Sequence, residues 1–185
     1  LNLEEKNLIA KDTYEFVFKK PQGFSFKPGQ YLEWMLPHKD SDHKGSRRYF
    51  TIASSPTEDK VRVAMKILDG ASSYKEMIKG LDVAHPLIAS QLAGDFLLPN
   101  ERETKLALIA GGIGVTPFRS HIKWMLDSGK VHDTTLYYCV NTAAEIAYQE
   151  LWNEAARKFE FSFVPVVSKE VVSVPFESGY VTADM

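Results

Sequence analysis

The chain has 185 residues, 44% hydrophobic and 25% charged, a composition typical of a globular protein with one ordinary domain or two small ones. Its net charge of −2 gives no basis for binding nucleic acid. The one cysteine, Cys139, excludes an internal disulfide and a Cys-ligated iron–sulfur cluster, and no apolar run reaches the length of a membrane span.

Both ends of the sequence are expected to be internal to a longer protein. The chain begins at Leu1, and residues 179–184, just before Met185, have the pattern of a strand that runs into a helix start. The single cysteine favours a reducing compartment. We therefore expect an excised piece of a cytoplasmic protein, or of the cytoplasmic part of a membrane-anchored parent, with no membrane contact of its own.

The first hundred residues predict short strands. Residues 13–18 alternate with period two, as a strand with one buried face does. Further strands are predicted over residues 31–36, 49–54, 61–68, 87–90 and 96–98. Residues 37–46 are polar and predict an exposed loop, and a capping box at 73–76 predicts a helix over 73–79. This pattern is typical of an antiparallel β-barrel over residues 1–100.

After residue 100 strands alternate with helices. Residues 106–110 form a continuous apolar run, typical of a buried parallel strand. Then come a glycine loop, a helix over 117–127, a strand over 135–140, a helix opening with a capping box at 142–145, and a strand over 161–167. This order predicts a parallel sheet with right-handed crossovers, so residues 101–185 are expected to form a second, α/β domain.

A glycine-rich turn lies between the first parallel strand and its helix. Gly112 and Gly114 let the backbone turn sharply and come close to a ligand. Thr116 can cap the helix and Pro117 suits its first turn. The exposed N–H groups and the helix dipole then favour an anion such as a pyrophosphate. The alternative interpretation is an ordinary tight turn.

Two weaker motifs lie in the predicted barrel. Arg48 can pair with a phosphate, and the Thr51 hydroxyl can bond a ring nitrogen. Tyr49 and Phe50 face opposite sides of their strand, so one of them can lie against a ring ligand. A surface arginine with two core aromatics is the alternative.

Residues 70–73 stand at a helix start and offer a second phosphate site, for which a plain helix cap is the alternative. Together with Arg48, two anion-binding helix starts fit two dinucleotides better than one.

In order and spacing the motifs resemble the ferredoxin–NADP⁺ reductase superfamily over nearly the whole chain. The matching segments are residues 26–31, 48–55, 70–73, 94–99 and 112–120. The resemblance implies a flavin-binding barrel followed by a Rossmann-like NAD(P)-binding domain that is incomplete at its C-terminus. It implies that Arg48 pairs with the FAD pyrophosphate, that Phe50 lies against the isoalloxazine and that Thr51, near the reactive flavin nitrogen, is the catalytic residue.

The same resemblance implies two sets of cofactor-binding residues. The FAD set is Arg48, Tyr49, Phe50, Thr51, Met65, Lys66, Ile67, Gly70, Ala71, Ser72 and Ser73. The NADPH or NADH set is Gly112, Gly114, Thr116, Pro117, Ser168 and Lys169. Lys169 favours binding of the 2′-phosphate of NADPH, whereas Glu170 is compatible with NADH as the alternative coenzyme. FMN is the alternative to FAD.

The expected function is an oxidoreductase that passes electrons from NAD(P)H through FAD to a separate protein or domain carrying iron–sulfur, haem or flavin. The chain ends before the family's last strand and its cysteine motif, so the piece alone is expected to transfer hydride poorly. A non-catalytic flavin-binding or regulatory subunit, or an empty interaction module, is the alternative. No metal site is expected at His38 and His43, and His121 is expected to face solvent.

Overall fold

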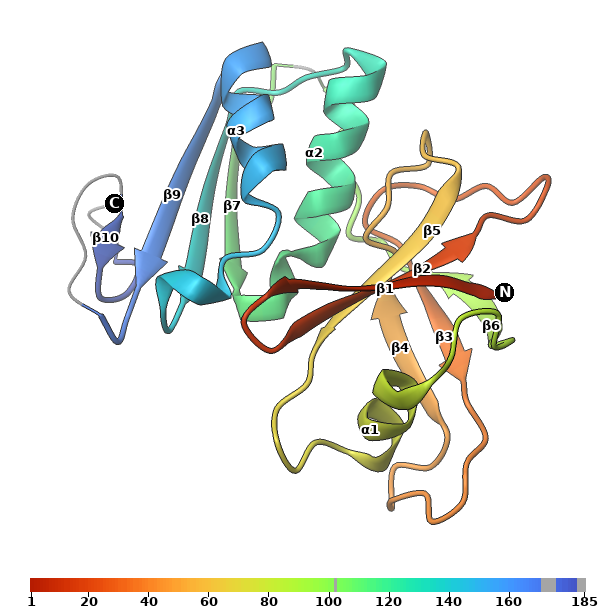
Figure 1. The fold of residues 1–185 in the computed structure, drawn as a ribbon. Helices are drawn as coiled ribbons and strands as arrows, with labels where there is room; N and C mark the ends of the chain where they lie inside the picture. The colour runs from red at the N-terminus through yellow and green to blue at the C-terminus, as the bar shows by residue number, and fades with distance from the viewer. Residues whose placement is uncertain (102, 171–175, 183–185) are drawn as a thin grey trace.

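The computed structural model describes residues 1–101, 103–170 and 176–182 (Figure 1). Its N-terminal part is built from antiparallel strands. The first sheet has the order β1-β2-β5, formed by β1 (Leu3–Ala10), β2 (Thr13–Lys19) and β5 (Lys60–Lys66). The second has the order β4-β3-β6, formed by β3 (Tyr31–Met35), β4 (Arg47–Thr51) and β6 (Ile88–Ala93).

One hydrophobic core lies between these two sheets. Phe18 of β2 packs on Trp34 of β3 with 4.7 Å between ring centroids, and both side chains are fully buried. Helix α1 (Ser73–Gly80) closes the core with Tyr74 and Ile78. Each such side chain contributes about 1.5–3 kcal/mol through burial. This core holds β4 and the start of α1 at one end of the N-terminal part.

The C-terminal part is a parallel sheet with the order β10-β9-β8-β7. Its strands are β7 (Leu106–Gly111), β8 (Thr134–Val140), β9 (Phe161–Val167) and β10 (Glu177–Ser178). The helical segments are the 3₁₀ helix η1 (Gly112–Val115), α2 (Thr116–Ser128), the 3₁₀ helix η2 (Ala143–Glu145) and α3 (Gln149–Lys158).

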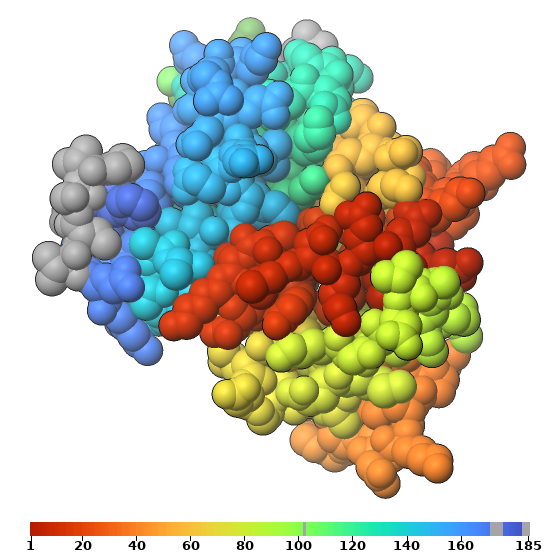
Figure 2. Space-filling model, in the orientation of Figure 1, coloured from red at the N-terminus to blue at the C-terminus, as the bar shows by residue number. Residues whose placement is uncertain are grey.

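Helices α2 and α3 cover the sheet face that carries Leu136 and Tyr138, and together they form a second core. Helix α2 lies between the parallel sheet and the antiparallel strands (Figure 1). The turn of the β1–β2 hairpin also reaches the C-terminal part, where the Lys11 N–H donates to the Ala144 carbonyl at 2.8 Å (Figure 2). The two halves therefore meet along α2 and along this hairpin.

The predicted fold class, antiparallel sheets followed by a parallel α/β sheet, is confirmed. Strand β1 has no counterpart among the predicted elements. The strand predicted over residues 96–98 is wrong: this segment is irregular, and Phe96 packs on Phe118 and His121 instead of pairing with a strand.

Both capping boxes are corrected by the structure. The N-cap of α1 is Ser72, not Ser73, and it makes no side-chain cap bond. The predicted helix start at residues 142–145 is only the short η2, and α3 begins at Gln149. The Ser73 hydroxyl is already engaged by His38 and the Asp42 N–H, each at 2.9 Å.

The run 106–110 forms a strand as predicted, but it is not buried. Strand β7 stands at the edge of the described sheet, and Ile109 is 59% exposed. Among the described residues, none of the helices has the length and apolar character needed to cross a membrane.

Candidate functional site

A cationic pocket lies where β4, the end of β5 and the start of α1 meet. It has a volume of about 490 Å³ and is lined by Lys44, Arg48, Lys66, Leu68, Asp69, Gly70, Ala71, Ser72 and Lys75. Burial, followed by the charges of Lys44 and Arg48, lowers the pKa of Lys75. The charges of Lys44 and Arg48 are the smaller part of this shift, and an anion entering the pocket would offset them.

Arg48 is held in place at this pocket by the protein itself. Its Nη1 donates to the carbonyls of Lys44, Gly45 and Arg47 at 2.7–2.8 Å. Its Nη2 donates to the carboxylate of Asp42 at 3.1 Å. The guanidinium is thus preorganised at the pocket wall, and its position fits the predicted role on a pyrophosphate.

At Gly70 a ligand in the pocket can come close to the backbone. It has φ of +72°, a conformation that favours glycine, and a Cβ built on it would meet no atom within 4 Å. Ala71 and Ser72 continue the lining toward the first turn of α1. The lining cations and the open glycine therefore fit a dinucleotide pyrophosphate.

The other predicted flavin residues lie on two sides of the β4 and β5 strands. Phe50 packs on the core and lies 5.9 Å from the Tyr74 ring, whereas Tyr49 is 58% exposed and donates to Glu33 at 3.0 Å. The predicted opposite orientation of the two rings is confirmed. Thr51 ends β4, opposite Tyr31.

Met65 and Ile67 have side chains buried in the core, so at these positions only the backbone is left to face a ligand. The lysine between them differs, because Lys66 lines the cationic pocket.

A second pocket lies at the carboxyl ends of the parallel strands, the edge where open α/β sheets bind ligands. It has a volume of about 280 Å³ and is lined by Lys66, Gly112, Cys139, Val140, Asn141, Glu145, Ser168, Gly179 and Tyr180. Gly112 has φ of +49°, and a Cβ on Gly112 or Gly114 would meet no atom within 4 Å. A ligand can therefore approach this backbone closely.

The helix start beside this pocket differs from the expected one. Residues 112–115 form η1, and Val115, not Thr116, is the N-cap of α2. The Thr116 hydroxyl donates to the Ile113 carbonyl at 3.2 Å, so it is not a side-chain cap. Pro117 lies in the first turn, as predicted. The N–H groups of this glycine loop that could face an anion therefore belong to η1.

The predicted coenzyme-selecting residues follow β9. Ser168 lines the second pocket, and the backbone N–H of Lys169 donates to the Asn141 carbonyl at 2.9 Å. The Lys169 side chain is exposed, and the Glu170 carboxylate accepts from the Ala143 N–H at 3.0 Å.

Lys66 connects the two pockets. It lines both of them, and its ammonium pairs with Glu145 at 2.6 Å. In Glu145, burial alone would raise the pKa of the carboxyl, but the bond and charge of Lys66, together with hydrogen bonds to Asn141, outweigh burial and lower the pKa. The pair crosses from the antiparallel half to the C-terminal half and fixes the two pockets beside each other.

Helix α2 carries residues whose role the sequence did not reveal. Arg119 is buried, forms an ion pair with Glu58 and donates to the Ala53 carbonyl at 3.1 Å. The next residue, Ser120, donates to the Ser54 carbonyl at 2.6 Å. These bonds join the segment after β4 to the helix after the glycine loop. The matched segment 112–120 included both residues, which was the available signal.

His121 is buried, so its expected exposure is wrong. Its Nε2 lies 3.1 Å from the Phe96 carbonyl, and only 2% of the residue is exposed. Burial lowers its pKa to about 4, against the weaker opposing effect of bonds to the Pro28 and Phe96 carbonyls. The imidazole is therefore neutral at neutral pH. Among the described residues no group of His, Cys, Asp and Glu could hold a metal ion.

Comparison with known proteins identifies relatives over most of the chain. Residues 108–185 match the family model of the oxidoreductase NAD-binding domain. The reductase subunit of an aromatic O-demethylase from Amycolatopsis is 29% identical over 168 residues, which cover 88% of this chain and 49% of that protein. The chain thus spans about half the length of this curated relative.

Solved structures give the same result for the fold. The crystal structure of the Amycolatopsis cytochrome P450 reductase GcoB superposes with a TM-score of 0.83 at 25% identity, over 97% of this chain and 54% of that one. The ferredoxin–NADP⁺ reductase of Plasmodium falciparum superposes with a TM-score of 0.78 at 21% identity, over 93% of this chain and 74% of that one.

Proposed function

Because the chain belongs to the ferredoxin–NADP⁺ reductase superfamily, we propose that it takes electrons from NAD(P)H and passes them through FAD to a separate acceptor. One observation supports this most strongly: the cationic pocket and the glycine-lined pocket share Lys66. Electron transfer between two bound coenzymes needs two adjacent sites, and a single-ligand protein has no use for this arrangement.

The cationic pocket is proposed to hold the FAD pyrophosphate. Arg48 offers a fixed guanidinium, Lys44 and Lys75 add charge, and the backbone at Gly70 lets the phosphates approach. Phe50 and Thr51, near the carboxyl end of β4, are proposed to orient the ring system. FAD, when bound, supplies the ability to accept a hydride and to release electrons singly.

The second pocket is proposed to hold the nicotinamide nucleotide. The N–H groups of η1 and the open positions at Gly112 and Gly114 suit a pyrophosphate. Ser168 and Lys169 follow β9, where Rossmann-like domains meet the adenosine ribose. The exposed Lys169 ammonium favours a 2′-phosphate and hence NADPH over NADH.

The acceptor is proposed to be a separate protein or domain. The Amycolatopsis relative is named as the reductase subunit of an aromatic O-demethylase. The 185 residues of this chain include one cysteine, too few for a Cys-ligated iron–sulfur cluster within them.

The test is an anaerobic visible spectrum of the protein with FAD, before and after addition of NADPH or NADH. We expect FAD to bind, and its absorption to bleach faster with NADPH. Lys169→Ala should remove the preference for NADPH and leave FAD binding unchanged. If FAD binds and neither nucleotide bleaches it, these 185 residues bind flavin without a working nicotinamide site.

A further inference from the structure

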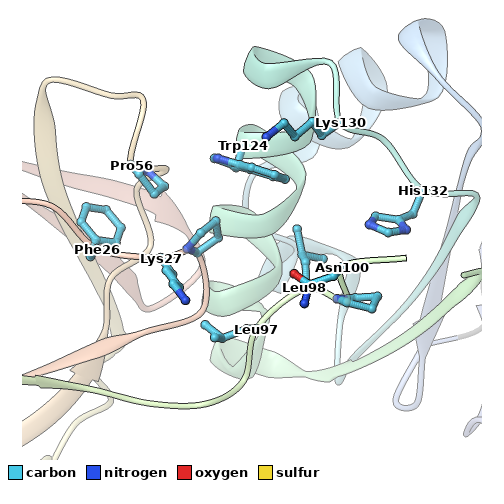
Figure 3. A pocket seen from close by; sticks show the side chains of 11 residues that line it. Phe26, Lys27, Pro56, Leu97, Leu98, Asn100, Trp124, Lys130 and His132 are labelled. Atoms are coloured by element: carbon cyan, nitrogen blue, oxygen red, sulfur yellow. The ribbon is translucent and has the colours of Figure 1, made fainter. Parts of the chain in front are cut away.

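We propose that a third cavity, separate from both coenzyme pockets, binds a small molecule that joins a flat apolar body to an anionic head group. The cavity has a volume of about 460 Å³, within the range of roughly 300–1,000 Å³ typical of ligand sites. It lies between the antiparallel half and α2, toward the helix end remote from the glycine loop (Figure 3). None of its lining residues lines either coenzyme pocket.

The apolar walls of the cavity come from four segments. Phe26 and Pro28 belong to the loop before β3, and Pro56 belongs to the turn before β5. Residues 97–99 form the opposite wall, and Trp124 projects from α2 (Figure 3). Trp124 is only partly buried, whereas Trp34 and Trp152 have no exposed surface. Part of the indole surface is thus left open to an aromatic or branched body.

The charge of the lining is positive. Lys27 and Lys130 are exposed lysines at the cavity, and among its described lining residues there is no carboxylate. Within the described chain, neither ammonium takes part in an ion pair. The Lys130 ammonium lies 5.7 Å from the centre of the Trp124 ring, so a cation already stands over the aromatic wall.

Polar side chains in the lining could orient the anionic head group of a ligand. Asn100 and His132 line the cavity beside Lys130 (Figure 3). The His132 Nδ1 bonds the Thr104 carbonyl at 3.1 Å, which fixes the ring. An amide, an imidazole and an ammonium suit a carboxylate or sulfonate, whereas a neutral apolar molecule would leave the lysines without a partner.

The site joins the two halves of the protein. Its lining includes Pro28 and Leu97. These residues are the chain neighbours of Gly29 and Phe96, which both pack against His121. A ligand that contacts the loop before β3, residues 97–100 and α2 together should favour the arrangement seen here. Binding should therefore raise the melting temperature of the whole chain.

The experiment is isothermal titration of the full chain with 2-naphthoate, and with the neutral 2-naphthamide as matched ligand. We expect naphthoate to bind and naphthamide to bind at least about fivefold more weakly, as for the loss of one exposed ion pair. Lys27→Met and Lys130→Met should each weaken naphthoate by about fivefold on the same basis. Lys11→Met, at an exposed lysine that lines none of the three pockets, should leave its affinity unchanged.

Trp124→Ala should weaken naphthoate by about tenfold or more, because it removes the aromatic wall. Trp124→Phe, which keeps a ring there, should lose less and guards against a folding defect in the alanine variant. Saturating FAD and NADPH should not displace naphthoate. Displacement, equal binding of naphthamide, or no binding at all would overturn the proposal. None of these outcomes depends on reductase activity, so the proposed function stands or fails separately.

Discussion

At the level of single residues, Arg48 is the side chain that the proposed flavin site tests most directly. Its Nη1 donates hydrogen bonds to three backbone carbonyls, and its Nη2 forms an ion pair with Asp42 at the pocket wall. The neighbouring Arg47 points to the other face of β4, where it pairs with Glu33 at 2.9 Å. Two adjacent arginines therefore differ in exposure to the proposed ligand and form a natural pair for mutation.

We predict that Arg48→Ala weakens FAD binding by about 1.5–3 kcal/mol, the value of a charged hydrogen bond. Arg47→Ala should change the affinity little, because its charge lies on the outer face of the sheet. Titration of the protein with FAD, followed by flavin fluorescence, measures both. Equal affinities for the wild type and Arg48→Ala would remove Arg48 from the site.

His121 makes the stability depend on pH in a defined window. Its pKa is lowered by burial to about 4, against 6.5 in an unfolded chain. As pH falls from 6.5 toward 4 the unfolded state takes up the proton first, so folded stability is lost across that window, by about 3 kcal/mol in total. Above pH 6.5 the contribution is fully present.

We predict that His121→Gln flattens this pH dependence, since a glutamine amide can still donate to the Phe96 carbonyl and does not titrate. Urea unfolding of both proteins between pH 4 and pH 7 gives the measurement. The difference between the two curves isolates His121 from the carboxylates. A wild-type curve parallel to that of the variant would contradict the assignment.

The sequence predicted the orientation of Tyr49 and Phe50 but not the burial of His121, and the reason is physical. Neighbouring side chains on a strand point to opposite faces whatever packs on them. A helix has a solvent face only if one of its sides is free. Helix α2 is covered by the parallel sheet on one side and by the antiparallel half on another, so periodicity alone could not place His121.

At the level of elements, the sequence predicted those strands whose apolar residues alternate with polar ones or form a continuous run. Strand β1 was missed because most of its middle is exposed and its pairing with β2 has irregular register, so it carries no period of two. The capping boxes failed because a hydroxyl near a helix start can bond elsewhere. The Ser73 hydroxyl bonds His38 and Asp42, which lie more than thirty residues away.

The glycine loop was predicted from the sequence. The structure shows that Gly112 and Gly114 are suited to glycine for different reasons. Gly112 has a positive φ, so glycine suits its backbone conformation. Gly114 does not, and a Cβ there would meet no protein atom. Glycine at position 114 is therefore not required for folding, and the open space in front of it is left to a ligand.

We predict that Gly114→Val lowers NADPH affinity by more than about tenfold, because the added side chain keeps the phosphates from hydrogen-bond distance of the backbone. Stability should change by less than about 0.5 kcal/mol, and FAD affinity should not change. Gly80→Val, at an exposed glycine ending α1 that is equally open, is the control. Titration calorimetry with NADPH decides. Loss of FAD instead of NADPH would mean that the two pockets are assigned in reverse.

At the level of the whole molecule, charged groups buried between the two halves hold them together. Arg119 of α2 reaches Glu58, and Glu58 also pairs with Arg62 at 3.3 Å. Arg62 pairs in turn with Glu15 at 2.7 Å, and the Tyr148 hydroxyl donates to Glu15 at 3.0 Å. This chain of contacts joins β2, β5, α2 and the segment before α3. Residues so far apart in sequence give no periodic signal, which is why composition and spacing could not predict it.

The charge state of Glu58 follows from this position. Burial alone would raise the pKa of its carboxyl, but the hydrogen bond and charge of Arg119, together with the bond from the Ser55 N–H and the charge of Arg62, lower it. Glu58 is therefore ionised, and removal of Arg119 would leave a carboxylate between the halves with Arg62 as its remaining charged partner.

We predict that Arg119→Met destabilises the protein by about 1.5–3 kcal/mol, the value of a hydrogen bond to a charged group, because Glu58 keeps Arg62 as a charged partner. Lys123→Met, which breaks an exposed pair with Asp127 on the same helix, should lose less than about 1 kcal/mol. The double variant Arg119→Met/Glu58→Gln should recover part of the loss, since it removes the partly buried carboxylate that Arg119 no longer neutralises. Calorimetric melting measures all three. Similar losses for Arg119→Met and Lys123→Met would show that the buried pair does not hold the halves together, and that burial of the α2 side chains does so alone.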